Sequence, residues 1–95
     1  MKRFSWNHEK NETLQRERGI SFEAAVFHIA QGDLLDILEH PNRERYPGQR
    51  IFVVKIVNYA YLIPFVENES EIFLKTIIPS RKATATYLPG RRENG

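Results

Sequence analysis

The chain has 95 residues, of which 41% are hydrophobic and 27% are charged, proportions typical of a single globular domain with one modest core. It contains no cysteine, which excludes a disulfide framework, a thiolate nucleophile and a zinc–thiolate site, and which fits a reducing, intracellular setting. No signal-peptide pattern follows Met1–Lys10 and no apolar run approaches membrane-spanning length, so we expect a cytoplasmic protein.

The formal net charge of +2 is small, but the charges are unevenly distributed. Residues 1–18 hold five cations and three acidic residues, residues 19–70 hold four and seven, and residues 71–95 hold five and two. Basic termini around an acidic middle suit a face that contacts phosphate groups. A solvated basic tail at Arg91 and Arg92 gives the same distribution.

Two helices are predicted near the N-terminus from composition and capping residues. Asn7 stands at an N-cap position before Glu9–Arg18, which consists largely of helix-forming residues and is followed by Gly19. Ser21 is a second N-cap, and the residues that recur at helical spacing after it, before Gly32, are Phe22, Ala25, Val26 and Ile29. We expect the second helix to pack on a sheet.

Apolar runs and turn residues predict the strands of that sheet. Phe4–Trp6 is a short aromatic alternation that either pairs as an edge strand or anchors the N-terminus in the core. Pro64, within the run Tyr59–Val66, has no amide hydrogen to donate to a neighbouring strand, which indicates a strand end, an edge or a bulge at that position. His40–Gly48 is a long polar loop in which function can reside. The main predicted strands are Asp33–Glu39, Gln49–Val57, Tyr59–Val66 and Glu71–Ile78, with Phe52, Val54 and Ile56 on one face of the second and Tyr61, Ile63 and Phe65 on one face of the third.

The last predicted strand carries a charge in an unusual place. Lys75 lies inside an apolar run that breaks at Pro79. A lysine there must either reach solvent at the sheet face or use its charge. Beyond the break, Ser80 is placed to cap a short helix that runs through Tyr87.

Together these elements predict an α+β fold. It consists of two N-terminal helices, a roughly four-stranded antiparallel sheet, and a short C-terminal helix or turn. No linker or internal repeat divides the chain, so residues 1–95 form one domain, of which residues 88–95 are expected to be a flexible tail.

Several short motifs occur in a recognisable order along the chain. They are the aromatic pair of Phe4–Trp6, a charged helix ending at Gly19–Ile20, the SFEAA run of Ser21–Ala25, and the closing LKTIIPSRKAT of Leu74–Thr84. In this order and spacing the chain resembles the BrnT family of bacterial type II toxins. The resemblance covers roughly Phe4–Tyr87, which is most of the sequence.

The resemblance implies a fold similar to that of the RelE/ParE toxin superfamily and a ribonuclease activity that arrests translation. It also implies neutralisation by a BrnA-like antitoxin, with operator DNA bound only through that antitoxin, and an assembly that is a homodimer or a heterotetramer with the antitoxin. The chain departs from the family at Arg18, where histidine is frequent, and after Lys82, where fewer cations follow.

Cleavage of RNA through its own 2′-hydroxyl sets requirements that can be compared with the sequence. One group must take the hydroxyl proton, positive charge must stabilise the phosphate oxygens, and another group must protonate the leaving 5′-oxygen. Arginine and lysine suit the second task, and we predict Arg81, with Lys75 or Lys82, as a cationic clamp. Lys55 and Arg50 are further candidates for binding the substrate.

The acid and the base have weaker candidates. Histidine titrates near neutral pH, so His40 in the long loop is a candidate, and Tyr61 or Tyr87 is a candidate proton donor, Tyr87 also for substrate binding. The simpler interpretations are a solvated loop residue for His40 and packing for the tyrosines. The histidines are far apart in sequence and have no i,i+4 pairing, so we expect neither a metal nor a cofactor.

Two functions stay open at this point. The first is an RNA-cleaving toxin that acts through a cationic pocket on the sheet, with an antitoxin covering that pocket or its rim. The second is a non-catalytic module that binds the antitoxin and contributes to a DNA-binding repressor complex. The small number of cations after Lys82 favours the second.

Overall fold

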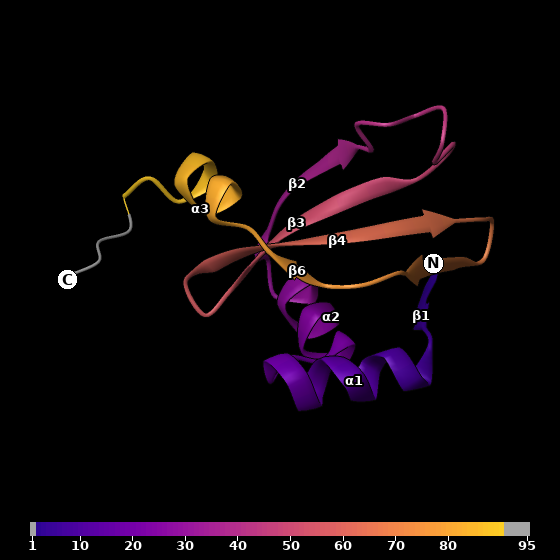
Figure 1. Cartoon of the computed structure of the whole chain (residues 1–95), viewed down its shortest axis with the longest axis horizontal. Coiled ribbons are helices and arrows are strands. Elements are labelled where there is room, and N and C mark those ends of the chain that lie inside the picture. Colours follow the sequence, from indigo (N-terminus) through magenta and orange to yellow (C-terminus); the bar gives the residue numbers. More distant parts are fainter. Residues whose placement is uncertain (1, 91–95) are drawn as a thin grey trace.

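Helices lie on both faces of a single sheet in this chain (Figure 1). The computed structural model describes residues 2–90, within which three helices and six strands form. In chain order these are β1 (Arg3–Trp6), α1 (His8–Arg18), α2 (Phe22–Ala30), β2 (Leu34–Glu39), β3 (Arg50–Ile56), β4 (Tyr59–Glu67), β5 (Glu71–Leu74), β6 (Ile78–Pro79) and α3 (Arg81–Tyr87).

The predicted capping residues begin all three helices. The side chains of Asn7, Ser21 and Ser80 each accept a hydrogen bond from the amide three residues later, at 2.8, 3.0 and 3.0 Å. These bonds satisfy amide groups that have no partner within the helix. Gly19 ends α1 in the left-handed conformation, with φ of 69°, which a residue without a side chain adopts at little cost.

The sheet has the strand order β1-β5-β4-β3-β2, and β6 pairs with β4. The predicted α+β class is confirmed, but the predicted four strands are too few. Phe4–Trp6 is an edge strand, and it runs parallel to β5 with Phe4 opposite Ile72. Pairing of such distant segments is not visible in local periodicity, because it depends on how the intervening chain crosses the fold.

The second difference concerns Lys75, which was predicted to lie inside a strand. β5 ends one residue earlier, and the chain pairs with β4 again only at Ile78. Leu74 and Ile77 are both fully buried in the same core, three residues apart, so the two-residue alternation of a regular strand is interrupted between them. The Lys75 amide still donates to the Pro64 carbonyl at 2.8 Å, and its side chain is exposed to solvent.

Alternate residues of the central strands fill two cores. Val54 and Ile63 are fully buried on the face covered by α1 and α2, as their alternation predicts. Val53 and Ala60 point to the other face, where they pack with Ala83 of α3. Figure 1 shows the corresponding separation, with α1 and α2 at the bottom of the view and α3 at the upper left. The larger core also contains Leu14, Phe22, Ala25, Phe52, Ile56, Phe65, Leu74 and Ile77.

Hydrogen bonds attach α3 to the sheet. The Ser80 amide donates to the Ala60 carbonyl at 3.0 Å, and the Ala60 amide donates to the Thr84 hydroxyl at 2.9 Å. The Leu88 amide donates to the Thr84 carbonyl at 2.9 Å and closes the helix. Of the tail expected from Leu88 onward, residues 91–95 lie outside the described part of the chain.

A buried asparagine joins the first two helices. Asn11 is 4% exposed; its side-chain oxygen accepts from the Phe22 amide and its nitrogen donates to the Glu23 carboxylate, both at 2.8 Å. The pKa of Glu23 is lowered mainly by this hydrogen bond from Asn11. The side chain therefore fixes the start of α2 against α1.

Replacing Asn11 with leucine is expected to lower the free energy of unfolding by about 1–3 kcal/mol, because the buried Phe22 amide is left without an acceptor. Urea denaturation at neutral pH measures this change. Glu17→Gln, an exposed change on the same helix, serves as the control and should leave stability nearly unchanged. Equal stability of the Asn11→Leu variant and the wild type would contradict the expectation.

Candidate functional site

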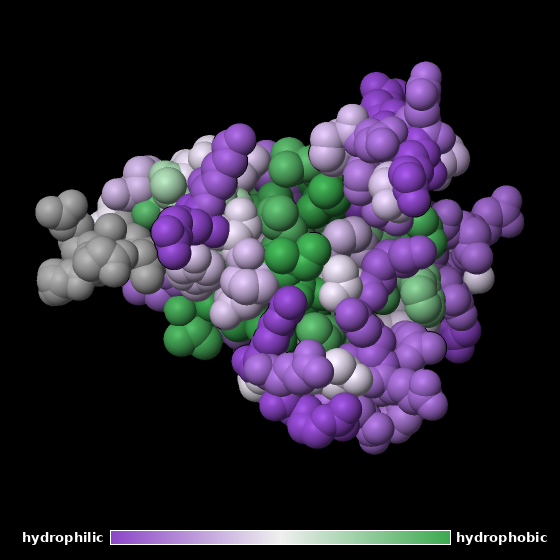
Figure 2. Space-filling model, in the orientation of Figure 1, coloured by the Kyte–Doolittle hydropathy of each residue, from purple (hydrophilic) through white to green (hydrophobic). Residues whose placement is uncertain are grey.

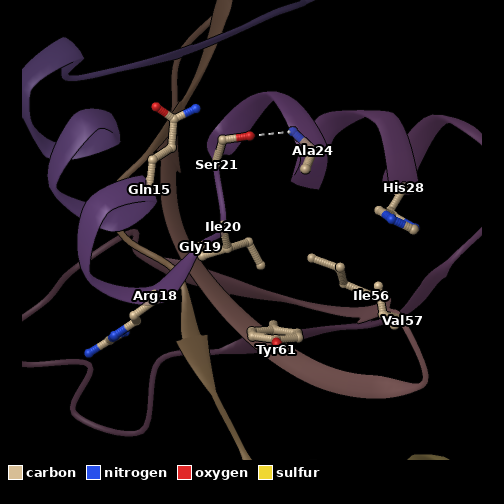
Figure 3. Close-up of a pocket in the computed structure, with 10 residues that line it drawn as sticks. All are labelled: Gln15, Arg18, Gly19, Ile20, Ser21, Ala24, His28, Ile56, Val57 and Tyr61. Carbon is tan, nitrogen blue, oxygen red and sulfur yellow. Dashed lines mark hydrogen bonds between the residues drawn. The ribbon is translucent and has the colours of Figure 1, made fainter.

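A pocket of about 490 Å³ lies between α1, α2 and the β3–β4 hairpin (Figure 3). We call it the helix-face pocket. Figure 3 shows Arg18 and His28 at opposite ends of it in this view, with Tyr61 between them on the floor. Its polar lining residues are Gln15, Arg18, Ser21, His28 and Tyr61.

Arg18 supplies positive charge to this pocket. It is the last residue of α1, and its guanidinium donates to the Ile77 carbonyl at 2.7 Å. A guanidinium has five N–H donors, so this bond orients the group and leaves the others available. No acidic residue among residues 2–90 forms an ion pair with Arg18. The side chain can therefore bind an anion.

His28 is held in a fixed orientation by Asp33. Its Nδ1 lies 2.8 Å from a carboxylate oxygen of Asp33, and both side chains are 19% exposed. The Gln31 amide donates to the same oxygen at 2.7 Å. Hydrogen bonds from Gln31 and then from His28 lower the pKa of Asp33, so this carboxyl group is ionised at neutral pH.

This pairing determines what the imidazole of His28 can do. An ionised carboxylate accepts a hydrogen bond, which favours the tautomer with the proton on Nδ1 and leaves Nε2 as the acceptor. The Asp33 amide also donates to the His28 carbonyl at 2.9 Å, which fixes the turn at the end of α2. His28 thus has the arrangement of a general base: the Asp33 carboxylate holds Nδ1, and Nε2 is left to accept a proton.

A second concavity, of about 480 Å³, lies on the other face of the sheet beside α3. We call it the α3 groove. Leu38, Ile51 and Leu62 supply its apolar lining, and Lys82 and Tyr87 of α3 lie along it. Figure 2 shows hydrophobic surface over the central strands, bordered by hydrophilic residues. Because the groove is largely apolar, it suits the binding of a hydrophobic partner better than it suits acid–base chemistry.

The Tyr87 hydroxyl donates a hydrogen bond to the Asp36 carboxylate of β2 at 2.7 Å. The bond is the main cause of a lowered pKa for Asp36 and of a raised pKa for Tyr87. Its stabilising effect is complete between the ordinary pKa values of about 3.9 for aspartate and 10 for tyrosine. It is lost as pH falls through the lowered pKa of Asp36 or rises through the raised pKa of Tyr87.

We expect Tyr87→Phe to lower the urea midpoint at pH 7, and the difference from wild type to shrink in strong acid and in strong alkali, where the bond is absent in both proteins. Tyr46→Phe is the matched control, because Tyr46 lies in the exposed loop between β2 and β3. A midpoint difference that is independent of pH would show that the hydroxyl acts in some way other than through Asp36.

The structure separates the residues that the sequence suggested as one site. Tyr61 lines the helix-face pocket, whereas Lys82 and Tyr87 line the α3 groove on the other face. Arg81 and Lys75 are exposed and line neither of these two concavities.

The remaining candidates have structural contacts of their own. The Nδ1 atom of His40 accepts from the Asn42 amide at 3.0 Å, within the β2–β3 loop. Arg50 pairs with Glu67 at 2.6 Å. Lys55 is half-buried on β3, where its amide donates to the Asp33 carbonyl at 2.9 Å and its charge contributes slightly to the lowered pKa of Asp33.

Sequence reasoning did not select Arg18 or His28 as functional residues. Arg18 has the ordinary interpretation of a cation near a helix C-terminus, which made it uninformative. For His28 a weak signal was present, because an acidic residue follows five positions later, across the end of the helix at Gly32. That spacing permits a pair but does not indicate a pocket.

Comparisons with known proteins add no assignment: no family model, curated protein or solved structure matches the chain. In the part of the chain that the structure describes, no group of three or more histidine, cysteine or acidic residues is arranged to hold a metal ion. Nor is any helix within residues 2–90 long and apolar enough to cross a membrane.

Proposed function

We propose that this protein is a cytoplasmic, metal-independent ribonuclease toxin of a type II toxin–antitoxin system, similar to the BrnT family. The observation that carries the proposal is His28, oriented by Asp33, in the same pocket as the unpaired Arg18. A positioned base and a fixed positive charge are two of the groups that cleavage through the 2′-hydroxyl requires.

In the proposed reaction, Nε2 of His28 takes the proton of the RNA 2′-hydroxyl as that oxygen attacks the adjacent phosphorus atom. Arg18 stabilises the negative charge that develops on the phosphate oxygens. The bond between phosphorus and the 5′-oxygen breaks, and Tyr61 protonates that oxygen. The products are a 2′,3′-cyclic phosphate and a 5′-hydroxyl. To complete the cycle, His28 releases its extra proton to solvent and Tyr61 takes one from solvent.

This proposal gives the role of cationic clamp to Arg18 instead of Arg81 and Lys75. Growth measurements can distinguish the two sites. Induction of the chain without a partner in a bacterial host is expected to stop growth and degrade RNA. Arg18→Lys keeps the charge but not the planar fork and should relieve the arrest. Arg81→Ala and Lys75→Ala should still arrest growth. Relief by Arg81→Ala alone would place the clamp at α3 instead.

The α3 groove favours a second candidate function. Its apolar lining by Leu38, Ile51 and Leu62 suits a hydrophobic segment of a BrnA-like antitoxin, and a chain that only binds this partner would act within a repressor complex on operator DNA. In that case, induction of the folded chain alone leaves growth and RNA intact, while charged substitutions at Leu62 prevent the antitoxin from co-purifying. The assembly as homodimer or heterotetramer remains a prediction.

A further inference from the structure

Two large apolar side chains are exposed in or next to the helix-face pocket. Phe27 of α2 is 61% exposed, and Val57 at the tip of the β3–β4 hairpin is 85% exposed. The Phe27 ring packs edge-to-face on His28, with centroids 5.6 Å apart, so it lies directly beside a residue of the pocket. Val57 lines the pocket itself, and Figure 3 shows it across a gap from His28.

The backbone conformation at Val57 indicates that its exposed side chain contributes to function and not to stability. Its φ of 49° lies in the left-handed region, which β-branched residues avoid, and Asn58 follows with φ of 69°. Two central residues with positive φ form the tight hairpin turn that asparagine and glycine favour. A valine at the first of these positions is strained and also exposes apolar surface to water, two costs that an asparagine would not carry.

The surroundings of these two side chains indicate the kind of ligand. Val57 lines a pocket that also holds the unpaired cation Arg18 and the polar groups of Ser21 and Tyr61, and Phe27 contacts His28 of the same pocket. An apolar surface beside a cationic pocket matches a nucleotide, which has a flat aromatic base next to a negatively charged phosphate. The apolar face of a protein helix would leave the guanidinium without a partner.

We propose that Phe27 and Val57 form a binding site for the unpaired base of a nucleotide whose phosphate enters the helix-face pocket, so that the substrate is single-stranded RNA. This inference rests on the proposed function. The base stacks on the Phe27 ring, and Val57 closes over its other side. A base within a duplex is already stacked and paired, so it cannot reach this rim.

Binding can be measured separately from cleavage. A single-stranded 2′-deoxy oligonucleotide lacks the attacking hydroxyl and cannot be cleaved, and the same strand annealed to its complement is the duplex control. The wild-type chain should bind the single strand more tightly than the duplex. Phe27→Ala should weaken single-strand binding by about 5- to 100-fold, the usual effect of losing one stacking contact, and Phe27→Trp should retain it.

Two further variants test the specificity of this rim. Tyr46→Ala removes another exposed aromatic residue, 39% exposed in the β2–β3 loop, and should leave the affinity unchanged. Val57→Asn should raise the melting temperature, because asparagine accepts a positive φ, and should weaken single-strand binding.

Equal affinity of Phe27→Ala and wild type overturns the base-binding site, and if RNA cleavage persists in that variant the proposed function stands. If the rim instead holds a protein, Phe27→Ala loses the antitoxin but not the oligonucleotide, which also overturns the inference. A wild-type chain that neither binds the single strand nor cleaves RNA overturns both the inference and the proposed function.

Discussion

Replacing His28 with asparagine is expected to lower the rate of RNA cleavage by about 10²- to 10⁴-fold, the usual contribution of a positioned general base. The asparagine side chain can place an N–H donor where Nδ1 of the imidazole lies, so the hydrogen bond to Asp33 is preserved. What is lost is Nε2, the atom that takes the proton in the proposed reaction. The variant should therefore fold normally and yet be inactive.

Cleavage of a labelled RNA by purified protein measures this effect, and thermal unfolding checks the fold. The matched control is His40→Asn. His40 is the histidine that the sequence suggested as acid or base, but it lies in the β2–β3 loop and does not line the helix-face pocket. We expect this control to cleave at the wild-type rate. Full activity in His28→Asn, or loss of activity in His40→Asn alone, would rule out the helix-face pocket as the site of the base.

The second large effect concerns the core that supports the pocket. Phe22 is fully buried at the start of α2, and its ring stacks on Trp6 with centroids 5.5 Å apart. Phe22→Ala is expected to lower the free energy of unfolding by about 3–5 kcal/mol, through lost burial and the cavity that remains. A domain of this size has a free energy of unfolding of about 5–15 kcal/mol. A large fraction of the variant molecules would therefore be unfolded at moderate temperature.

Phe27→Ala provides an internal control for this prediction. It is the same substitution on the same helix, but at a side chain that is 61% exposed, so its effect on stability should be within about 0.5 kcal/mol. Circular dichroism during heating and urea denaturation measure both variants. If the two substitutions destabilised the protein equally, Phe22 would not be the core residue that its burial indicates.

The same comparison shows how much of the candidate site the sequence contained. Helical spacing assigned Phe22 to the inner face of α2, and the ring is indeed fully buried. Nothing in that spacing distinguished His28 from an ordinary residue of the helix surface. Its pairing with Asp33 is local, but its position in a pocket with Arg18 and Tyr61 depends on α1 and α2 meeting β4, which is far from both helices in sequence.

What the sequence determined by itself is local. Asn7, Ser21 and Ser80 begin the helices because each side chain bonds an amide three residues away, and the alternation around Val54 selects the buried face because neighbouring side chains on a strand point in opposite directions. Interactions of this range require no knowledge of the rest of the fold.

The tertiary structure alone decided which distant segments meet. It paired Phe4–Trp6 in parallel with β5, interrupted the last predicted strand at Lys75 so that both Leu74 and Ile77 reach the core, and placed Arg18 beside the Ile77 carbonyl. These contacts depend on loop closure and on competition for space within one core, to which every segment contributes. Local patterns do not contain that information, which is why the helix-face pocket became visible only in the folded chain.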